Sequence, residues 1–291
     1  MARPEITQAM IDAYDEYTHL TLDRRGFMDK LTRLTGSAAA AAAVAPLIAA
    51  SSARAAMVAA DDARIAGEEV SFEGASGPVS GYLVKPTAAE GPMPAVIVIH
   101  ENRGLNEHIR DVARRVALEG FVALAPDFLS PAGGTPDDED RAREMIGQLD
   151  AAQTRQNAAA AVTYLMERDD TTGKVGAVGF CWGGGLANDL AAASPELAAA
   201  VPYYGRQANL DEVPNIQAAL MLHYAGLDER INAGIDAYRA ALEAHGKEFE
   251  IHVYEGANHA FNNDTSEARY HKEAAELAWS RTIAFFKDKL G

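Results

Sequence analysis

Cysteine and positive charge are both scarce in this sequence of 291 residues, and each shortage excludes a class of protein. The single cysteine, Cys181, excludes an intrachain disulfide framework and any metal site built from several cysteines. Lysine and arginine number 26 against 42 acidic residues, which gives a formal net charge of −16. Residues 1–55 hold six residues of each sign, so the acidic excess lies on residues 56–291. Such a surface repels phosphate backbones and anionic lipids, which argues against a nucleic-acid-binding protein.

A long, strongly apolar run is also missing. Residues 34–53 carry no charge, but Ala, Ser, Thr and Gly dominate them and Pro46 interrupts them. We therefore expect no stable membrane span. The arginine pair Arg24-Arg25 precedes this stretch, and a small-x-small sequence at residues 53–55 follows it. Residues 1–55 thus resemble a twin-arginine export signal, which predicts a periplasmic or exported protein.

The same segment has a feature that a cleaved signal does not need. Ile6, Met10, Tyr14 and Tyr17 recur at spacings of four, four and three residues, which is typical of an amphipathic helix. In the alternative interpretation, residues 1–55 are retained as a helical arm and the protein stays in the cytoplasm. The arm would then pack on the body of the protein or on a second copy of the chain, giving a homo-oligomer.

Residues 56–291 alternate between short apolar runs and longer helical patterns. Runs rich in Val and Ile without polar alternation are typical of parallel strands covered on both faces. We predict strands at residues 79–85, 95–100, 121–125, 174–180, 198–203, 218–224 and 248–254, and helices at residues 106–119, 141–168, 182–193, 231–245 and 268–289. This alternation predicts one α/β domain with a mostly parallel, doubly wound sheet flanked by helices. Ligands bind such sheets at the carboxyl ends of the strands.

A candidate nucleophile follows the predicted strand at residues 174–180. The sequence Gly179-Phe180-Cys181-Trp182-Gly183 matches the Gly-x-nucleophile-x-Gly elbow, with cysteine in place of serine. The glycines permit a tight turn in which the nucleophile takes strained backbone angles, and a helix N-terminus favours the thiolate that attacks. The alternative is a buried structural cysteine beside glycines that let the helix and the sheet pack closely.

Two further strand ends supply the partners that a nucleophilic thiol needs. Asp228 follows the predicted strand at residues 218–224, and His259 follows the one at residues 248–254. The order Cys181, Asp228, His259 is the nucleophile–acid–histidine order of α/β-hydrolases. An imidazole can take the thiol proton, and a carboxylate fixes its tautomer and stabilises the imidazolium ion. Taken singly, Asp228 could equally be a loop cap and His259 a turn residue.

Together these motifs resemble the dienelactone hydrolase family of α/β-hydrolases over residues 70–290. The resemblance is carried by the elbow, by Asp228 and by residues 100–106, 125–127, 203–205 and 258–261. It implies a cysteine-dependent hydrolase of carboxylic esters or lactones, with a small-molecule substrate, a Cys181–Asp228–His259 triad and a thioester intermediate. It implies no metal and no organic cofactor.

The resemblance also implies roles for residues around the thiol. Glu101 would hold the resting thiol protonated and give way when substrate binds. Its place directly after a predicted strand independently puts it at the active edge of the sheet, where a salt bridge to Arg103 is the alternative. The oxyanion hole would be formed by the backbone N–H groups of Asn102 and Trp182.

The substrate itself is expected to differ from dienelactone. Members of the family that take this anionic lactone hold its carboxylate with two arginines, and the corresponding residues 260–263 and 128–131 contain none here. A neutral or differently shaped ester is therefore the expected substrate. Arg103 and Arg206 follow strand ends and, with Tyr204, are the candidate substrate contacts; the alternative for Arg206 is an ordinary surface arginine.

A protein of a different class is also consistent with Cys181, namely a thiol redox sensor or a non-catalytic binder on the same scaffold. Such a protein would not need Asp228 and His259, and their presence in order argues against it. The remaining histidines form no metal-ligand spacing, and we expect each on the surface or satisfied in the core. They are His19, His108, His223, His245, His252 and His271.

Overall fold

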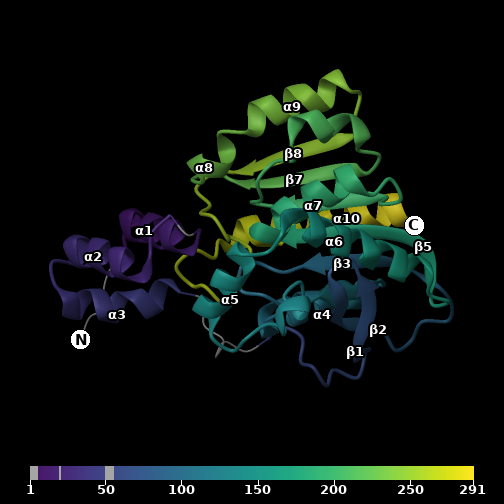
Figure 1. Cartoon of the computed structure of the whole chain (residues 1–291), viewed down its shortest axis with the longest axis horizontal. Helices are drawn as coiled ribbons and strands as arrows, with labels where there is room; N and C mark the ends of the chain where they lie inside the picture. The colour runs from purple at the N-terminus through teal and green to yellow at the C-terminus, as the bar shows by residue number, and fades with distance from the viewer. Residues whose placement is uncertain (1–5, 20, 50–55) are drawn as a thin grey trace.

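The computed structural model describes residues 6–19, 21–49 and 56–291 (Figure 1). Its centre is an eight-stranded sheet in the order β1-β2-β4-β3-β5-β6-β7-β8. Strand β2 pairs antiparallel with β1 and β4, and the other neighbouring strands are parallel, as the α/β prediction requires. The strands are β1 (Ile65–Gly74), β2 (Gly77–Pro86), β3 (Met93–Ile99), β4 (Val122–Pro126), β5 (Thr171–Phe180), β6 (Ala199–Tyr203), β7 (Ala219–Ala225) and β8 (Phe249–Tyr254).

The seven strands expected from the sequence are all present, and β1 is an additional strand that the sequence patterns did not reveal. It lies at the edge of the sheet, where it pairs with β2 along its whole length. Only Ile65 and Phe72 of β1 are buried, because one edge and most of its side chains face solvent. A strand of this kind has too few apolar positions to stand out in a sequence.

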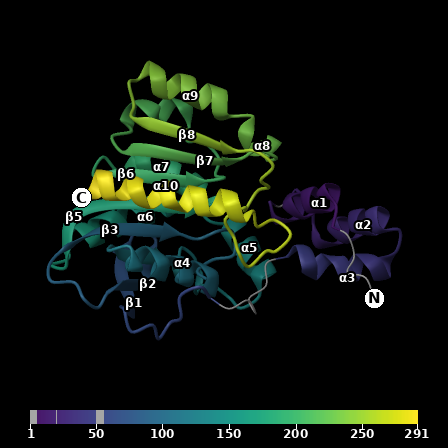
Figure 2. The same cartoon turned by 180° about the vertical axis from the view of Figure 1, so that it is seen from behind.

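Helices cover both faces of the sheet, with α10 crossing one face in the foreground of Figure 2. One face is covered by α4 (Glu107–Leu118) and α10 (Lys272–Leu290). The other is covered by α6 (Ala151–Met166), α7 (Trp182–Ala193) and α9 (Ile235–Ala244). The shorter helices are α5 (Glu139–Gly147), α8 (Glu229–Asn232), η1 (Ser130–Ala132) and η2 (Leu210–Asn215).

Two of the expected helices are each divided in the structure. The helix predicted at residues 141–168 is broken between α5 and α6, because Asp150 caps α6 by accepting the N–H of Gln153 at 2.8 Å. The helix predicted at residues 231–245 is divided into α8 and α9. The break brings α8 to the edge of the sheet that carries the candidate site residues.

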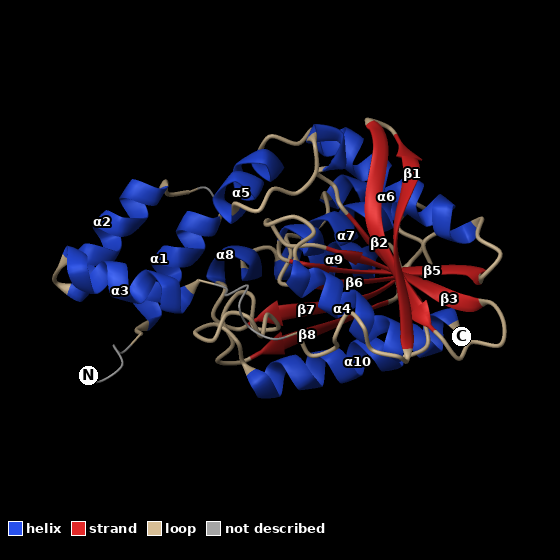
Figure 3. Cartoon of the chain, turned by 90° about the horizontal axis from the view of Figure 1, so that it is seen from below, coloured by secondary structure: helices blue, strands red, loops and turns tan. Residues whose placement is uncertain are grey.

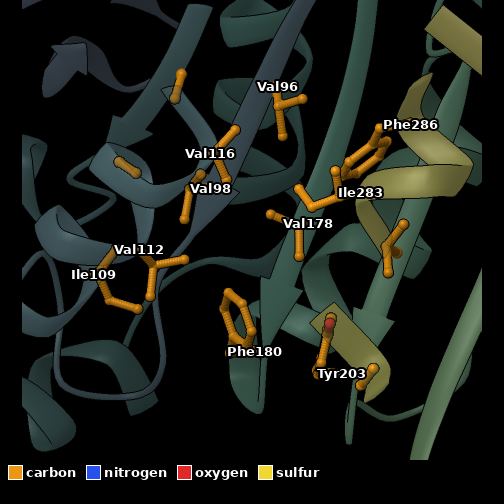
Figure 4. Close-up of a cluster of buried hydrophobic side chains, with 14 of the residues drawn as sticks. Val96, Val98, Ile109, Val112, Val116, Val178, Phe180, Tyr203, Ile283 and Phe286 are labelled. Atoms are coloured by element: carbon orange, nitrogen blue, oxygen red, sulfur yellow. The ribbon is translucent and has the colours of Figure 1, made fainter. Parts of the chain in front are cut away.

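Alternating side chains of the central strands fill two separate cores. In β3, Val96 and Val98 face α4 and α10, whereas Ile97 and Ile99 face α6 and α7, and all four are fully buried. Figure 4 shows the first of these cores, where the valines meet side chains of α4 and α10. Because both faces of the sheet are covered, its strand ends are where functional side chains can reach a ligand.

The arm has three helices beside the carboxyl ends of the strands, drawn in purple in Figure 1 and separated from the sheet in Figure 3. They are α1 (Gln8–Thr18), α2 (Arg24–Thr35) and α3 (Ala38–Ile48). The amphipathic helix expected from the spacing is confirmed, since Met10, Tyr14 and Tyr17 are buried. Tyr17 stacks on Phe27 of α2 with ring centroids 5.0 Å apart, so the arm has a small apolar core of its own.

The described residues contain no single helix that is long and apolar enough to cross a membrane. Helices α2 and α3 meet that test of length and composition as a pair, bent by 111°. The small-x-small sequence at residues 53–55 lies outside the described residues. The export interpretation therefore stays a prediction.

Candidate active site

The chain turns sharply at Cys181, where β5 ends and α7 begins. Cys181 has φ 56° and ψ −114°, a strained conformation that few residues other than glycine adopt. The turn needs a glycine two residues earlier, because a Cβ on Gly179 would lie 2.0 Å from the carbonyl oxygen of Gly183. The backbone thus makes the turn that the elbow motif predicts, and it leaves the thiol 9% exposed at the N-terminus of α7.

Asp228 and His259 come together from the ends of β7 and β8. His259 Nδ1 lies 2.5 Å from Asp228 Oδ2, and Asp228 Oδ1 accepts the N–H of Ile231 at 3.2 Å, which caps α8. An ionised carboxylate only accepts hydrogen bonds, so Nδ1 carries the hydrogen and Nε2 is the nitrogen left for the thiol. One short helix therefore positions the carboxylate that orients the imidazole.

The charges around this pair favour a proton on His259. Burial opposes a positive charge there, but the negative charges of Cys181 and Asp228 and the hydrogen bond to Asp228 raise the pKa of His259 well above its usual range. Burial also works to raise the pKa of Asp228, yet the charge and hydrogen bond of His259 outweigh it and the pKa falls below its usual value. His259 is therefore able to hold the proton of an ionised thiol.

A third side chain at the thiol comes from the arm. His19 Nε2 lies 3.5 Å from Cys181 Sγ, and the His19 ring stands edge-on to that of His259 with centroids 4.6 Å apart. His19 Nδ1 lies 2.6 Å from the backbone carbonyl oxygen of Asp15, so Nδ1 donates and Nε2 accepts. Burial and then the positive charges of His259 and Arg230 lower the pKa of His19 well below its usual value. The ring is neutral and presents a lone pair to the thiol.

The expectation that His19 lies on the surface or in the core is wrong. It is separated from Cys181 by 162 residues, and no motif connects the two positions. The amphipathic spacing of Ile6, Met10, Tyr14 and Tyr17 is the one signal that leads toward it, because that spacing predicts an arm packed on something.

Glu101 is buried near the thiol and binds Asn263 rather than Arg103. Its Oε2 accepts from Asn263 Nδ2 at 2.7 Å, and its Oε1 has no hydrogen-bond partner among the described residues. The alternative of a salt bridge to Arg103 is wrong, since Arg103 pairs with Glu139 and donates to the hydroxyl of Tyr14 at 2.8 Å. Glu101 and the thiol line the same small cavity.

The two residues expected to form the oxyanion hole flank the thiol. Asn102 follows β3, and Trp182 is the first residue of α7. The side-chain amide of Asn102 donates to the backbone carbonyl of Thr18, and Trp182 stacks on His100 with ring centroids 5.1 Å apart. Both residues line the cavity beside the thiol, and the role of their backbone N–H groups as an oxyanion hole stays a prediction.

A cavity of about 370 Å³ opens beside the thiol. Thr18 and His19 of the arm form part of its wall, and Trp182 of the body forms another part. Its apolar part is completed by Ile146, Leu149, Leu186 and Ile231. This volume falls in the range of about 300–1,000 Å³ that is usual for small-molecule sites.

The candidate substrate contacts divide into two groups. Tyr204 and Arg206 line the larger cavity, whereas Arg103 lines the small cavity that it shares with the thiol and Glu101. Arg206 pairs with Asp189, and its side chain is 58% exposed. Arg230 also lines the larger cavity, although no sequence motif points to it.

Buried polar contacts fasten the arm to the body around this cavity. Asp15 of α1 pairs with Arg269 at 3.3 Å, and their side chains are 21% and 7% exposed. The guanidinium group of Arg143 lies 3.8 Å from the ring centre of Tyr17 and donates to the Tyr17 carbonyl at 2.9 Å. The docking surface of the arm is therefore built partly from buried cations of the body.

The sheet topology and the elbow at the end of β5 define a protein of the α/β-hydrolase class. The chain belongs to the dienelactone hydrolase family, since the model named "Dienelactone hydrolase family" matches residues 79–290. A protein of Escherichia coli O157:H7 named "Putative carboxymethylenebutenolidase" is 33% identical over 242 residues, which cover 78% of this chain and 88% of the relative. "Protein usf" of Aquifex pyrophilus is 36% identical over 237 residues, which cover 77% of this chain and 99% of the relative.

Solved structures agree with this assignment. The structure titled "Putative Dienelactone Hydrolase" from Klebsiella pneumoniae subsp. pneumoniae MGH 78578 is similar with a TM-score of 0.70 and 32% identity, covering 77% of this chain and 98% of that one. Brefeldin A esterase shares the fold with a TM-score of 0.67 and 15% identity, covering 98% of this chain and 94% of that one. Family membership makes the protein a hydrolase that acts on ester or lactone bonds.

Proposed function

We propose that the protein is a cysteine-dependent hydrolase of carboxylic esters or lactones that uses Cys181, Asp228 and His259. The observation that carries this proposal is the buried Asp228–His259 pair, in which Nδ1 is held by the carboxylate and Nε2 has no hydrogen-bond partner among the described residues. Nucleophilic catalysis by a thiol needs an imidazole oriented in this way, and redox sensing by a thiol does not require one.

Formation of the thioester begins with the thiol proton. The side chain of Cys181 turns from His19 toward His259, whose Nε2 takes the proton. The thiolate attacks the ester carbonyl carbon, and the carbonyl oxygen becomes an oxyanion that accepts from the N–H groups of Asn102 and Trp182. The C–O bond to the leaving group then breaks, and His259 returns its proton to the departing alkoxide.

Hydrolysis of the thioester reuses the same groups. Neutral His259 removes a proton from water, and the resulting hydroxide attacks the thioester carbonyl. The C–S bond breaks, the carboxylic acid leaves, and the thiolate takes the proton back from His259. Asp228 keeps the imidazole in one tautomer and stabilises its charged form in both halves of the reaction.

We also propose that residues 1–55 are retained in a cytoplasmic enzyme, in preference to cleavage as an export signal. The proposal is supported by the ion pair of Asp15 with buried Arg269 and by the cation–π contact of Arg143 with the ring of Tyr17. Loss of the arm would leave two cations of the body without the partners that now cover them. The mass of the intact protein from its native cells tests this, since retention predicts a chain that still contains residues 6–49 and cleavage near residue 55 would contradict it.

A short-chain p-nitrophenyl ester tests the proposed chemistry. We expect one acyl group on Cys181, detected by mass spectrometry, followed by steady turnover. Cys181→Ala should abolish turnover, His259→Ala should reduce kcat/KM by about 10³-fold or more, and Asp228→Ala should leave weak activity. The exposed His245→Ala is the matched control and should behave as wild type. Wild-type turnover by Cys181→Ala would overturn the proposal.

A further inference from the structure

Three side chains that are good transition-metal ligands meet at the junction of the arm and the body. His19 comes from the end of α1, Cys181 from the elbow, and His259 from the segment between β8 and α10. Their ligand atoms all lie within 4.8 Å of one another, and His19 Nε2 is 3.5 Å from Cys181 Sγ. The docked arm therefore supplies one of the two imidazoles at this thiol.

The outer hydrogen bonds of both imidazoles are those of metal-bound histidines. A ligating histidine almost always donates its second ring N–H to a carboxylate or a backbone carbonyl, which fixes the tautomer and turns the other nitrogen toward the metal. His259 Nδ1 is 2.5 Å from the carboxylate of Asp228, and His19 Nδ1 is 2.6 Å from the carbonyl of Asp15. Nε2 of His19 therefore lies 3.5 Å from the thiol sulfur, and Nε2 of His259 belongs to the same cluster of ligand atoms.

The Nε2 atom of His259 is available to a ligand. His259 is buried, with 3% of it exposed, and its Nε2 has no hydrogen-bond partner among the described residues. A buried nitrogen without a hydrogen-bond partner is unfavourable until a proton, a metal ion or a substrate group binds it. This nitrogen without a hydrogen-bond partner therefore lies in the space that it shares with Cys181 Sγ and His19.

The donor set selects the chemical class of the ion. One thiolate and two neutral imidazoles suit Zn²⁺ and similar borderline ions, whereas Ca²⁺ and Mg²⁺ require oxygen ligands. Tetrahedral Zn²⁺ with bonds of about 2.0–2.3 Å holds its ligand atoms about 3.3–3.8 Å apart. The Sγ to His19 Nε2 distance already has this value, and the ligand atom of His259 lies within 4.8 Å of both.

We propose that His19, Cys181 and His259 form a Zn²⁺ site that reversibly blocks the enzyme and fastens the arm to the body. The metal takes the Sγ lone pair and both Nε2 lone pairs, the thiol proton passes to solvent, and the fourth position faces the cavity. Binding rests on the geometry of the three ligands alone. The block rests on the proposed function, because it requires Cys181 and His259 to be the groups that turn over substrate.

Cobalt gives a readout of binding that is independent of activity. Full-length protein freed of metal is titrated with Co²⁺, and we expect a thiolate-to-cobalt charge-transfer band together with the intense visible bands of tetrahedral cobalt. Zn²⁺ should displace the cobalt, and the displacement gives the zinc affinity. Cys181→Ala should abolish the charge-transfer band.

The arm ligand is tested by His19→Gln with the exposed His245→Gln as the matched control. We expect His19→Gln to bind Zn²⁺ at least about tenfold more weakly, with His245→Gln unchanged. His19→Asn serves as a second variant in case the first does not fold, and circular dichroism checks both. Equal zinc affinity in a folded His19 variant, or the absence of tetrahedral cobalt bands in the wild type, would overturn the inference.

Ester turnover then separates this inference from the proposed function. Inhibition by Zn²⁺ that is reversed by a chelator, and weaker in His19→Gln by the same factor as binding, supports both. Tight zinc binding without inhibition would contradict the role of Cys181 and His259 in turnover. Turnover that depends on Cys181 in a protein that binds no zinc would contradict the metal site alone.

Discussion

At the scale of single residues, the thiol of Cys181 lies between two imidazoles of opposite character. His259 is paired with a carboxylate that favours its charged form, whereas His19 is held neutral by burial and by the positive charges around it. A thiol that donates to His19 keeps its proton, and a thiol that turns to His259 loses it. Under the proposed mechanism, the rotation of the Cys181 side chain decides between a resting and a reactive thiol.

Glu101 is predicted to restrain the same thiol through its charge. Its carboxylate is buried, and a second anion close to it is disfavoured because little solvent screens the two. We expect Glu101→Gln to be alkylated by iodoacetamide at Cys181 faster than wild type at neutral pH. The exposed Glu73→Gln on β1 is the control and should react at the wild-type rate.

Equal or slower alkylation of Glu101→Gln would leave Glu101 with a structural role only. In that case its hydrogen bond from Asn263, which ties the end of β3 to the segment before α10, would be sufficient to explain it. The comparison is made on folded protein, checked by the thermal midpoint of each variant.

At the scale of elements, α1 is held by side chains from three parts of the body. Arg143 belongs to α5, Arg269 to the segment before α10, and Asn102 to the segment after β3. Each of these parts also borders the cavity or carries a residue that does. Undocking of α1 would therefore open the cavity and remove His19 from the thiol at the same time.

Asp15→Asn is predicted to loosen this docking. It removes the ion-pair partner of buried Arg269 and leaves this cation with the charge of Glu101, so the docking of the arm is weakened. We expect faster tryptic cleavage at Arg24-Arg25 and faster alkylation of Cys181 than in wild type. Asp12→Asn, on the exposed side of α1, is the control. If trypsin cleaves Asp15→Asn no faster than it cleaves Asp12→Asn, the role given to the ion pair is contradicted.

At the scale of the whole molecule, the stability of the protein is predicted to depend on Asp264 and on pH. Asp264 joins the segment that carries His259 to α4 through Arg115 at 2.9 Å and His108 at 3.3 Å. Burial works to raise the pKa of Asp264, but the hydrogen bonds and charges of His108 and Arg115 lower it to about 2. A depressed carboxyl pKa stabilises the fold above the unfolded value near 3.8 and loses that effect as the pH falls toward 2.

Denaturant unfolding at two pH values measures this contribution. We expect Asp264→Asn to lower the free energy of unfolding by about 1–2 kcal/mol at pH 6, after allowance for its partial exposure, and by much less near pH 2. The exposed Asp61→Asn is the control. A difference that stays constant with pH would show that the ionised form of Asp264 is not what stabilises the fold.

The charge of the whole molecule bears on the choice of substrate. A net charge of −16 disfavours the approach of an anion, although salt screens this beyond about 10 Å, and Arg206 in the cavity is already paired with Asp189. We expect short-chain neutral esters and lactones to have higher kcat/KM than dienelactone at fixed salt. A dienelactone preferred by tenfold, about 1.4 kcal/mol, would show that Arg230 or another cation replaces the missing arginines.

The sequence by itself determined the parts of the molecule that rest on short-range patterns. Apolar runs without alternation predicted the buried strands, and Cys181, Asp228 and His259 each stood directly after one of them. In a parallel sheet all such positions lie at one edge, so the pairing of Asp228 with His259 was predictable from topology. Edge strand β1 was not predictable from the sequence, because it pairs with β2 through backbone hydrogen bonds, and these leave little trace in the pattern of side chains.

Only the tertiary structure decided how the arm meets the site. Two contacts at the site join residues that are 162 positions apart, namely His19 with Cys181 and Asn263 with Glu101. No local sequence pattern predicts either contact. These contacts depend on where rigid elements come to rest against one another. The amphipathic spacing on α1 predicted that the arm packs against another surface. The buried cations Arg143 and Arg269 determine the place on the body where it packs.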